Sequence, residues 1–180
     1  DGAAGIRPVR DRIIRPLLEC SRPEIEAYLK QKSITWREDR TNQELDYTRN
    51  IIRNCLLPEM AEKLNTGTIQ HLAQFGTEMQ QTREFLQELV EEACQKIARV
   101  RPGQVQIDLH QMKKEKEFLQ ERIIRFCMKG AGCGLKDIQR THIQSVRELM
   151  EKQSGRQIQL PGGWLVRRTF DQLVIEQDAG

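Results

Sequence analysis

The chain has 180 residues, of which 38% are apolar and 31% are charged, and its formal net charge is +3. This length suits one domain or one and a half, and the plentiful Leu, Ile and Val exclude wholesale disorder. The apolar runs are too short for a transmembrane helix, and no signal-peptide pattern opens the sequence. We therefore expect no membrane partner and a cytoplasmic location.

The cysteines and histidines do not form a metal-binding pattern. The five cysteines are odd in number and include no C-x-x-C pair, which favours reduced thiols in a cytosolic protein. The histidines are isolated from one another at positions 71, 110 and 142. We therefore expect no metal site.

The first sixty residues predict two helices joined by a polar loop. The segment 12–18 is expected to be extended, because Pro16 biases Arg15 away from helical geometry. Ser21 and Glu24 have capping-box spacing, so a helix should begin there and run to about residue 32. A second helix is expected at 46–57, followed by a short helical piece at 59–65.

A long helix is predicted for residues 68–100, after the linker-like Asn65-Thr66-Gly67-Thr68. Apolar residues recur every seven positions, from Leu72 to Val100. Either a bundle core or an intermolecular coiled coil explains this pattern. We place a domain boundary before this helix, which gives domains of residues 1–64 and 65–180.

The last eighty residues predict both helices and strands. Alternating apolar residues indicate a strand at 104–109. A helix is expected at 116–129, with Phe118 among its inward residues, and another is expected to begin at Thr141. The end of the chain resembles a meander of two or three strands around Pro161-Gly162-Gly163. The expected fold class is mainly α: a helical bundle with a long central helix and a small C-terminal β hairpin or meander.

Residues 36–53 are the most unusual stretch, because they combine acids, amides and arginines. Arg49 and Arg53 are four residues apart, so on a helix they present two guanidinium groups on one face. Such a pair suits a phosphate or a carboxylate. A structural ion-pair network between the loop and the helix is the alternative.

These residues resemble a known family. The order and spacing of Ile14-Arg15-Pro16-Leu17-Leu18, Trp36-x-Glu38-Asp39-x-Thr41-Asn42 and Tyr47-x-Arg49-Asn50-x-x-Arg53 are similar to those of the tRNA(Ile)-lysidine synthetases. Residues 121–125 and the hairpin at 160–163 resemble that family's central substrate-binding domain more loosely. The Ser-Gly-Gly-x-Asp-Ser loop that binds ATP in this family is missing from the sequence.

The resemblance implies an ATP-dependent ligase of the PP-loop class. Such an enzyme adenylates the wobble cytidine of tRNA(Ile) with a CAU anticodon, and lysine then attacks to give lysidine. ATP, Mg²⁺, lysine and tRNA(Ile) are thus the implied cofactors and partners of the full-length enzyme, and a homodimer is left open. This chain would be a fragment with no complete catalytic set, inactive alone and without bound cofactor.

The resemblance also assigns residues to two sites. The border of the active site, facing ATP or tRNA phosphates, would contain Glu38, Asp39, Asn42, Arg49, Asn50 and Arg53. Cations of the C-terminal part are candidates for contacts with the tRNA backbone, or else they are solvated surface residues. They are Arg122, Arg125, Lys129, Arg140, Arg147, Arg167 and Arg168.

Two functions of other classes remain open at this point. The chain could be an RNA-binding module without enzymatic activity, or a helical protein-interaction or dimerisation domain built on residues 68–100.

Overall fold

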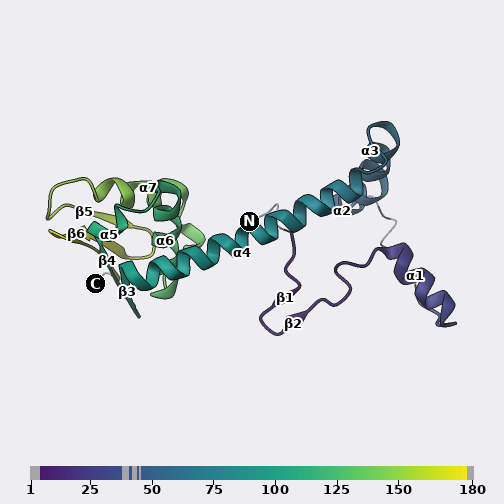
Figure 1. The fold of residues 1–180 in the computed structure, drawn as a ribbon, viewed down its shortest axis with the longest axis horizontal. Coiled ribbons are helices and arrows are strands. Elements are labelled where there is room, and N and C mark those ends of the chain that lie inside the picture. Colours follow the sequence, from purple (N-terminus) through teal and green to yellow (C-terminus); the bar gives the residue numbers. More distant parts are fainter. Residues whose placement is uncertain (1–4, 38–40, 42–43, 45, 178–180) are drawn as a thin grey trace. The chain divides into compact units, whose positions relative to one another are not determined.

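The computed structural model describes residues 5–37, 41, 44 and 46–177. The chain forms two compact units, residues 1–83 and residues 84–180 (Figure 1). A domain boundary at 64/65, which the sequence suggests, stays a prediction about the family's domains. We describe each unit by itself.

The first unit begins with a small hairpin and a capped helix. Strands β1 (Val9–Arg10) and β2 (Ile13–Ile14) pair in antiparallel register. Helix α1 (Arg22–Gln31) begins after Ser21, whose side chain accepts a hydrogen bond from the Glu24 amide while the Glu24 carboxylate accepts one from the Ser21 amide. The predicted capping box and helix are therefore confirmed.

A π-helical turn interrupts the second predicted helix. Helix α2 (Thr48–Ile51) continues into the π-helix η3 (Ile52–Leu56) and then into α3 (Leu57–Lys63). Pro58 explains the wider turn, because proline has no amide hydrogen and its ring clashes with the carbonyl four residues earlier. The amide of Leu57 reaches back five residues to the Ile52 carbonyl instead.

Helix α4 (Thr68–Ile97) is the predicted long helix, three residues shorter than expected. Its buried residues are Val90, Ala93, Cys94 and Ile97, which all belong to the second unit. Leu72 at the start of the seven-residue pattern is 49% exposed. The helix is therefore packed lengthwise only over its last two turns, and the bundle core expected along its whole length is wrong.

The second unit is built on a five-stranded antiparallel sheet with strand order β3-β4-β7-β6-β5. The first two strands form a hairpin, and the last three form the predicted C-terminal meander. The strands are β3 (Ala98–Arg101), β4 (Gln104–Asp108), β5 (Gln157–Leu160), β6 (Trp164–Arg168) and β7 (Gln172–Gln177).

Helices lie between the two halves of this sheet in the sequence and pack on it in space (Figure 1). They are α5 (Leu109–Met112), α6 (Glu117–Gly130), the 3₁₀ helix η4 (Leu135–Asp137) and α7 (Arg140–Leu149). Val105, Ile107, Val166 and Ile175 are fully buried on the helix side of the sheet. The opposite face carries mostly polar residues of the same strands, as the two-residue period of a strand requires.

Two local predictions in this unit are corrected. The sequence predicts an inward Phe118, but this side chain is 56% exposed. Gln120, two residues later on the same helix, is buried instead. Gln120 donates hydrogen bonds to the Met112 and Glu115 carbonyls, which satisfies its amide inside the protein. Helix α7 begins at Arg140 with Gln139 as its N-cap, so Thr141 lies inside the helix and does not cap it.

The expected fold class is also wrong. The main core is a five-stranded sheet covered by short helices, so the chain is a mixed α and β protein and not a helical bundle with a small hairpin. The prediction failed because β3 was assigned to the end of the long helix. The pairing of β4 with β7, about seventy residues later, leaves no local signal in the sequence, so the predicted meander gives no sign of the larger sheet.

Candidate functional site

Asn50 is the best-defined residue of the expected active-site border. It is 1% exposed, and its side-chain amide donates to the carbonyls of Thr41 and Glu44 at 2.9 and 2.8 Å. Its Oδ1 atom is buried and receives no hydrogen bond from any residue that the structure describes. Asn50 therefore ties the loop to the start of helix α2 and keeps one free acceptor.

Arg49 and Arg53 are both exposed on the segment that follows this loop. The guanidinium carbon of Arg49 lies 5.5 Å from the centre of the Tyr47 ring, within cation–π range. Arg53 belongs to the π-helical turn, a feature that is frequent at functional sites. The remaining members of the expected border, Glu38, Asp39 and Asn42, lie outside the described residues.

Two of the seven C-terminal cations pair with acids across the α6–α7 contact. Arg147 pairs with Glu117 at 2.5 Å, and Arg140 with Glu121 at 3.9 Å. Because each acid cancels the charge of its partner, these arginines contribute less to a positive surface than the sequence suggests. The arrangement instead fastens α7 to α6.

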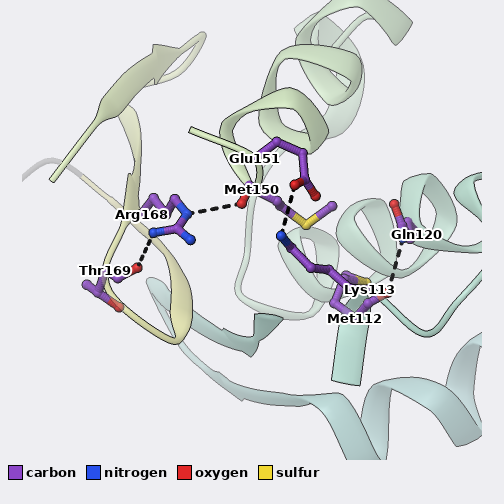
Figure 2. A network of polar contacts seen from close by, with 7 residues as sticks. All are labelled: Met112, Lys113, Gln120, Met150, Glu151, Arg168 and Thr169. Atoms are coloured by element: carbon purple, nitrogen blue, oxygen red, sulfur yellow. Dashed lines mark hydrogen bonds and ion pairs between the residues drawn. The ribbon is translucent and has the colours of Figure 1, made fainter. Parts of the chain in front are cut away.

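Arg125 and Arg168 are held by backbone carbonyls. Arg168 donates to the carbonyls of Met150 and Thr169 at 3.0 and 3.1 Å, which connects β6 to the end of α7 (Figure 2). Arg125 donates to the Ile138 carbonyl at 3.2 Å. Both side chains are half-buried, so their main contacts are structural.

Arg167, Arg122 and Lys129 complete the set. Arg167 pairs with Glu176 at 2.9 Å across neighbouring strands. The guanidinium carbon of Arg122 lies 4.6 Å from the centre of the exposed Phe118 ring. Lys129 is exposed on the same helix, seven residues after Arg122 and so on the same face.

Phe118 is the residue that sequence reasoning missed at this surface. An exposed aromatic ring beside an arginine can stack with nucleic-acid bases, as such rings commonly do in RNA-binding proteins. Its spacing of four residues from Arg122 was visible in the sequence. Because Phe118 is apolar, the sequence favours a buried position for it, and the four-residue spacing from Arg122 is then easily overlooked.

A hollow of about 750 Å³ lies beside these helices, between the α5–α6 connection and α7. Two of its three lining cations are paired: Lys113 binds Glu151 at 2.9 Å (Figure 2), and Arg147 binds Glu117, whereas Lys116 forms no ion pair with a described residue. A phosphate would have to compete with carboxylates for two of the three cations, and the lining also holds Glu115 and Glu148. We therefore do not regard this hollow as a preformed anion site.

No group of three or more His, Cys, Asp or Glu side chains is arranged to hold a metal ion within the described part of the chain. None of the helices in that part has the length and apolar character needed to cross a membrane. All five cysteines are free thiols.

Comparison with known proteins shows which family the chain resembles. A family model of the PP-loop domain matches residues 2–60, the segment that contains Asn50, Arg49 and Arg53. The chain is 31% identical over 179 residues, 98% of its length, to the tRNA(Ile)-lysidine synthase of Caldanaerobacter subterraneus subsp. tengcongensis. The resemblance to the tRNA(Ile)-lysidine synthetases is therefore confirmed.

Two further relatives carry the same name. The tRNA(Ile)-lysidine synthase of Solibacter usitatus is 33% identical over 174 residues, which is 96% of this chain. That of Treponema denticola is 58% identical over 57 residues, or 32% of this chain. The chain spans 38% and 39% of the Caldanaerobacter and Solibacter proteins, so it corresponds to less than half of each relative.

Proposed function

We propose that this chain is a segment of a tRNA(Ile)-lysidine synthetase, an ATP-dependent ligase that modifies tRNA in the cytoplasm. The single observation that carries the proposal is the similarity along nearly the whole chain to proteins named for this activity. In the proposed reaction, ATP transfers its AMP group to the wobble cytidine of tRNA(Ile) and releases pyrophosphate, and the lysine amine then displaces AMP. Other parts of the enzyme would supply the ATP-binding loop.

Residues 1–64 would form the C-terminal part of the catalytic domain. In the first unit, Ile14, Leu17 and Tyr28 are 71%, 58% and 57% exposed, although such side chains normally lie inside a protein. Only Asn50 is buried among the residues described there. This exposure is expected if these side chains pack on the rest of a PP-loop domain.

Arg49 and Arg53 would stabilise charge at the edge of the active site. Adenylation builds negative charge on the transferring phosphoryl oxygens, and fixed cations lower the energy of that state. The two exposed guanidinium groups suit this role or contact with the tRNA backbone. Asn50 would position the loop, and its free Oδ1 can accept a hydrogen bond from a substrate donor or from the rest of the domain.

Mg²⁺ is expected to accompany ATP, and no group of three or more His, Cys, Asp or Glu side chains among the described residues is arranged to hold it. Magnesium prefers carboxylate and phosphate oxygens. Asp39 and Glu38 are the carboxylates of the family motif, and both lie outside the described residues. We therefore assign no magnesium ligand and no step of the reaction to it.

The second unit would position the tRNA. Of the seven cations proposed for this role, Arg122 and Lys129 are the strongest candidates, because neither forms an ion pair or a hydrogen bond to a carbonyl among the described residues. The others would act mainly by holding the surface in shape. Phe118 would add a stacking surface next to Arg122.

The test is a titration of the full-length protein that contains this chain with tRNA(Ile) carrying the CAU anticodon. An unrelated tRNA is the control, and both are measured at two salt concentrations with lysine incorporation as a second readout. We expect preferential binding that weakens with salt, together with ATP-dependent lysine incorporation. Equal binding of both tRNAs without lysine incorporation would instead indicate a non-enzymatic RNA-binding module.

Salt-insensitive self-association without any RNA binding would support the dimerisation domain. A charged substitution at Leu86 in α4 provides the check, because Leu86 belongs to the seven-residue pattern and is only half-buried. If self-association survives that substitution, the helix does not mediate it.

A further inference from the structure

We infer that Cys94 and Cys127 form an oxidisable dithiol site that small disulfides reach through a surface hollow. The two sulfur atoms lie 2.9 Å apart inside the second unit, within an ångström of the roughly 2.05 Å length of a disulfide bond. Cys94 comes from the last turns of α4 and Cys127 from α6. The inference is independent of the proposed ligase activity.

Only one of the two thiols can be attacked from outside. Cys127 is completely buried, whereas Cys94 is 6% exposed and lines a hollow of about 390 Å³. Apolar residues form much of the wall, including Ala98, Val100 and Phe126. A small reagent that enters the hollow therefore meets Cys94 first.

The contact between the sulfurs also prepares Cys94 for reaction. A hydrogen bond from the Cys127 thiol lowers the pKa of Cys94, while the same contact and burial raise the pKa of Cys127. The thiolate is the reactive form of cysteine, so the accessible member of the pair is the better nucleophile. Cys133, the third buried cysteine, has its pKa raised by burial.

The reaction is a thiol–disulfide exchange with a low-molecular-weight disulfide such as glutathione disulfide. The Cys94 thiolate attacks one sulfur of glutathione disulfide, forms a mixed disulfide and releases one glutathione thiolate. Cys127 then loses its proton and attacks the Cys94 sulfur, which releases the second glutathione. Two protein thiols are oxidised, one disulfide is reduced to two thiols, and the two protons pass to the released glutathiones.

The new bond would join α4 to α6 across 33 positions of the sequence. Closing such a loop restricts the unfolded chain and stabilises the folded one. Oxidation would therefore stiffen the second unit around the β3 end of the sheet. Reduction of the disulfide by glutathione would reverse this stiffening.

The test uses the full chain with Cys20→Ser and Cys55→Ser, because these two cysteines are exposed and would react on their own. The folded protein is incubated with glutathione disulfide, its remaining thiols are blocked, and it is digested with trypsin without reduction. We expect residues 84–96 linked to residues 126–129, since trypsin separates each cysteine into its own peptide. The linked form should also unfold at a higher urea concentration than the reduced form.

Two matched variants distinguish a link between Cys94 and Cys127 from one that involves Cys133. Cys94→Ala should abolish the link, whereas Cys133→Ala, which also removes a buried sulfur, should leave it intact. The linked peptide is measured in the parent protein, so the result stands even if a variant fails to fold. The inference is overturned if glutathione remains attached to Cys94, if Cys133 forms the link, or if only the urea-unfolded chain reacts.

Discussion

Arg122 is the single cation whose substitution should weaken RNA binding most clearly. Its half-buried guanidinium group lies against an exposed ring and forms no ion pair among the described residues, so no carboxylate competes with a phosphate for its charge. In the full-length protein, Arg122→Ala should reduce tRNA affinity by about 1 kcal/mol and lower the salt slope of binding by about one unit. Fluorescence titrations at several salt concentrations measure both quantities.

The substitution Arg168→Lys provides a contrast to Arg122→Ala. This variant keeps the charge but loses the planar group that reaches the Met150 and Thr169 carbonyls. We expect unchanged salt dependence of tRNA binding and lower stability of the second unit. A large drop in the salt slope for Arg168→Lys, with stability unchanged, would reverse the roles that we assign to Arg122 and Arg168.

Asn50 gives a prediction at the border of the active site. Asn50→Ala removes both hydrogen bonds to the Thr41 and Glu44 carbonyls, and each such bond contributes about 0.5–1.5 kcal/mol to stability. We expect faster proteolysis of the loop around residues 41–46 in the full-length protein. Thr48→Ala, an exposed position on the same helix, is the control and should cleave at the parent rate.

The turn between β3 and β4 gives a prediction at the scale of an element. Gly103 has a φ of +74°, while Gly134 has a φ of −69°, and a Cβ would have open space at either position. Gly103→Ala should therefore destabilise the chain by about 1 kcal/mol through backbone strain alone. Gly134→Ala should be neutral or slightly stabilising. Urea unfolding measures both, and equal effects would show that conformation at Gly103 does not govern the hairpin.

Helix α1 should lose its N-terminal turn in acid. Hydrogen bonds from the Ser21 side chain and backbone lower the pKa of Glu24 below its ordinary value of 4.5. A lowered pKa in the folded state means that the capping contribution is present above about pH 4.5 and disappears as the pH falls through the folded value. Amide chemical shifts of residues 22–25 should follow this titration, and Glu24→Gln should remove it.

Local signals in the sequence predicted elements well where neighbouring residues decide the structure. The capping box of α1, the hairpin at 161–163 and the strand at 104–108 all depend on residues within a few positions of one another. Strand β3 was missed because Val100 fits both the seven-residue helical pattern and a strand. Its assignment depends on pairing with β4, which in turn pairs with β7 about seventy residues later.

The candidate site was predictable to a similar extent. The resemblance to the family motif implies a place at the active-site border for Asn50, Arg49 and Arg53, and this stays a prediction. The partners of the C-terminal cations could not be read in this way, because Glu117 and Arg147 are thirty residues apart and meet only when α6 packs on α7. Cys94 and Cys127 were invisible as a pair for the same reason.

At the scale of the whole chain, the two units should differ sharply in stability. The second unit contains every residue of the main hydrophobic core, whereas the first exposes most of its large apolar side chains. Stability follows buried apolar area, so local opening should be far easier in the first unit. Hydrogen exchange followed by mass spectrometry should show rapid exchange over residues 5–37 and strong protection in β4, β6, β7 and α6.

The same measurement on the full-length protein distinguishes two explanations of that difference. If residues 5–37 pack on the rest of a PP-loop domain, they should become protected there while α6 and the sheet keep the protection that they have in this chain. Strong protection of residues 5–20 in the isolated chain as a monomer would contradict the argument, because this segment would then be stable without further partners. Rapid exchange in both proteins would place its exposed apolar residues outside the domain core and remove one support for the proposed function.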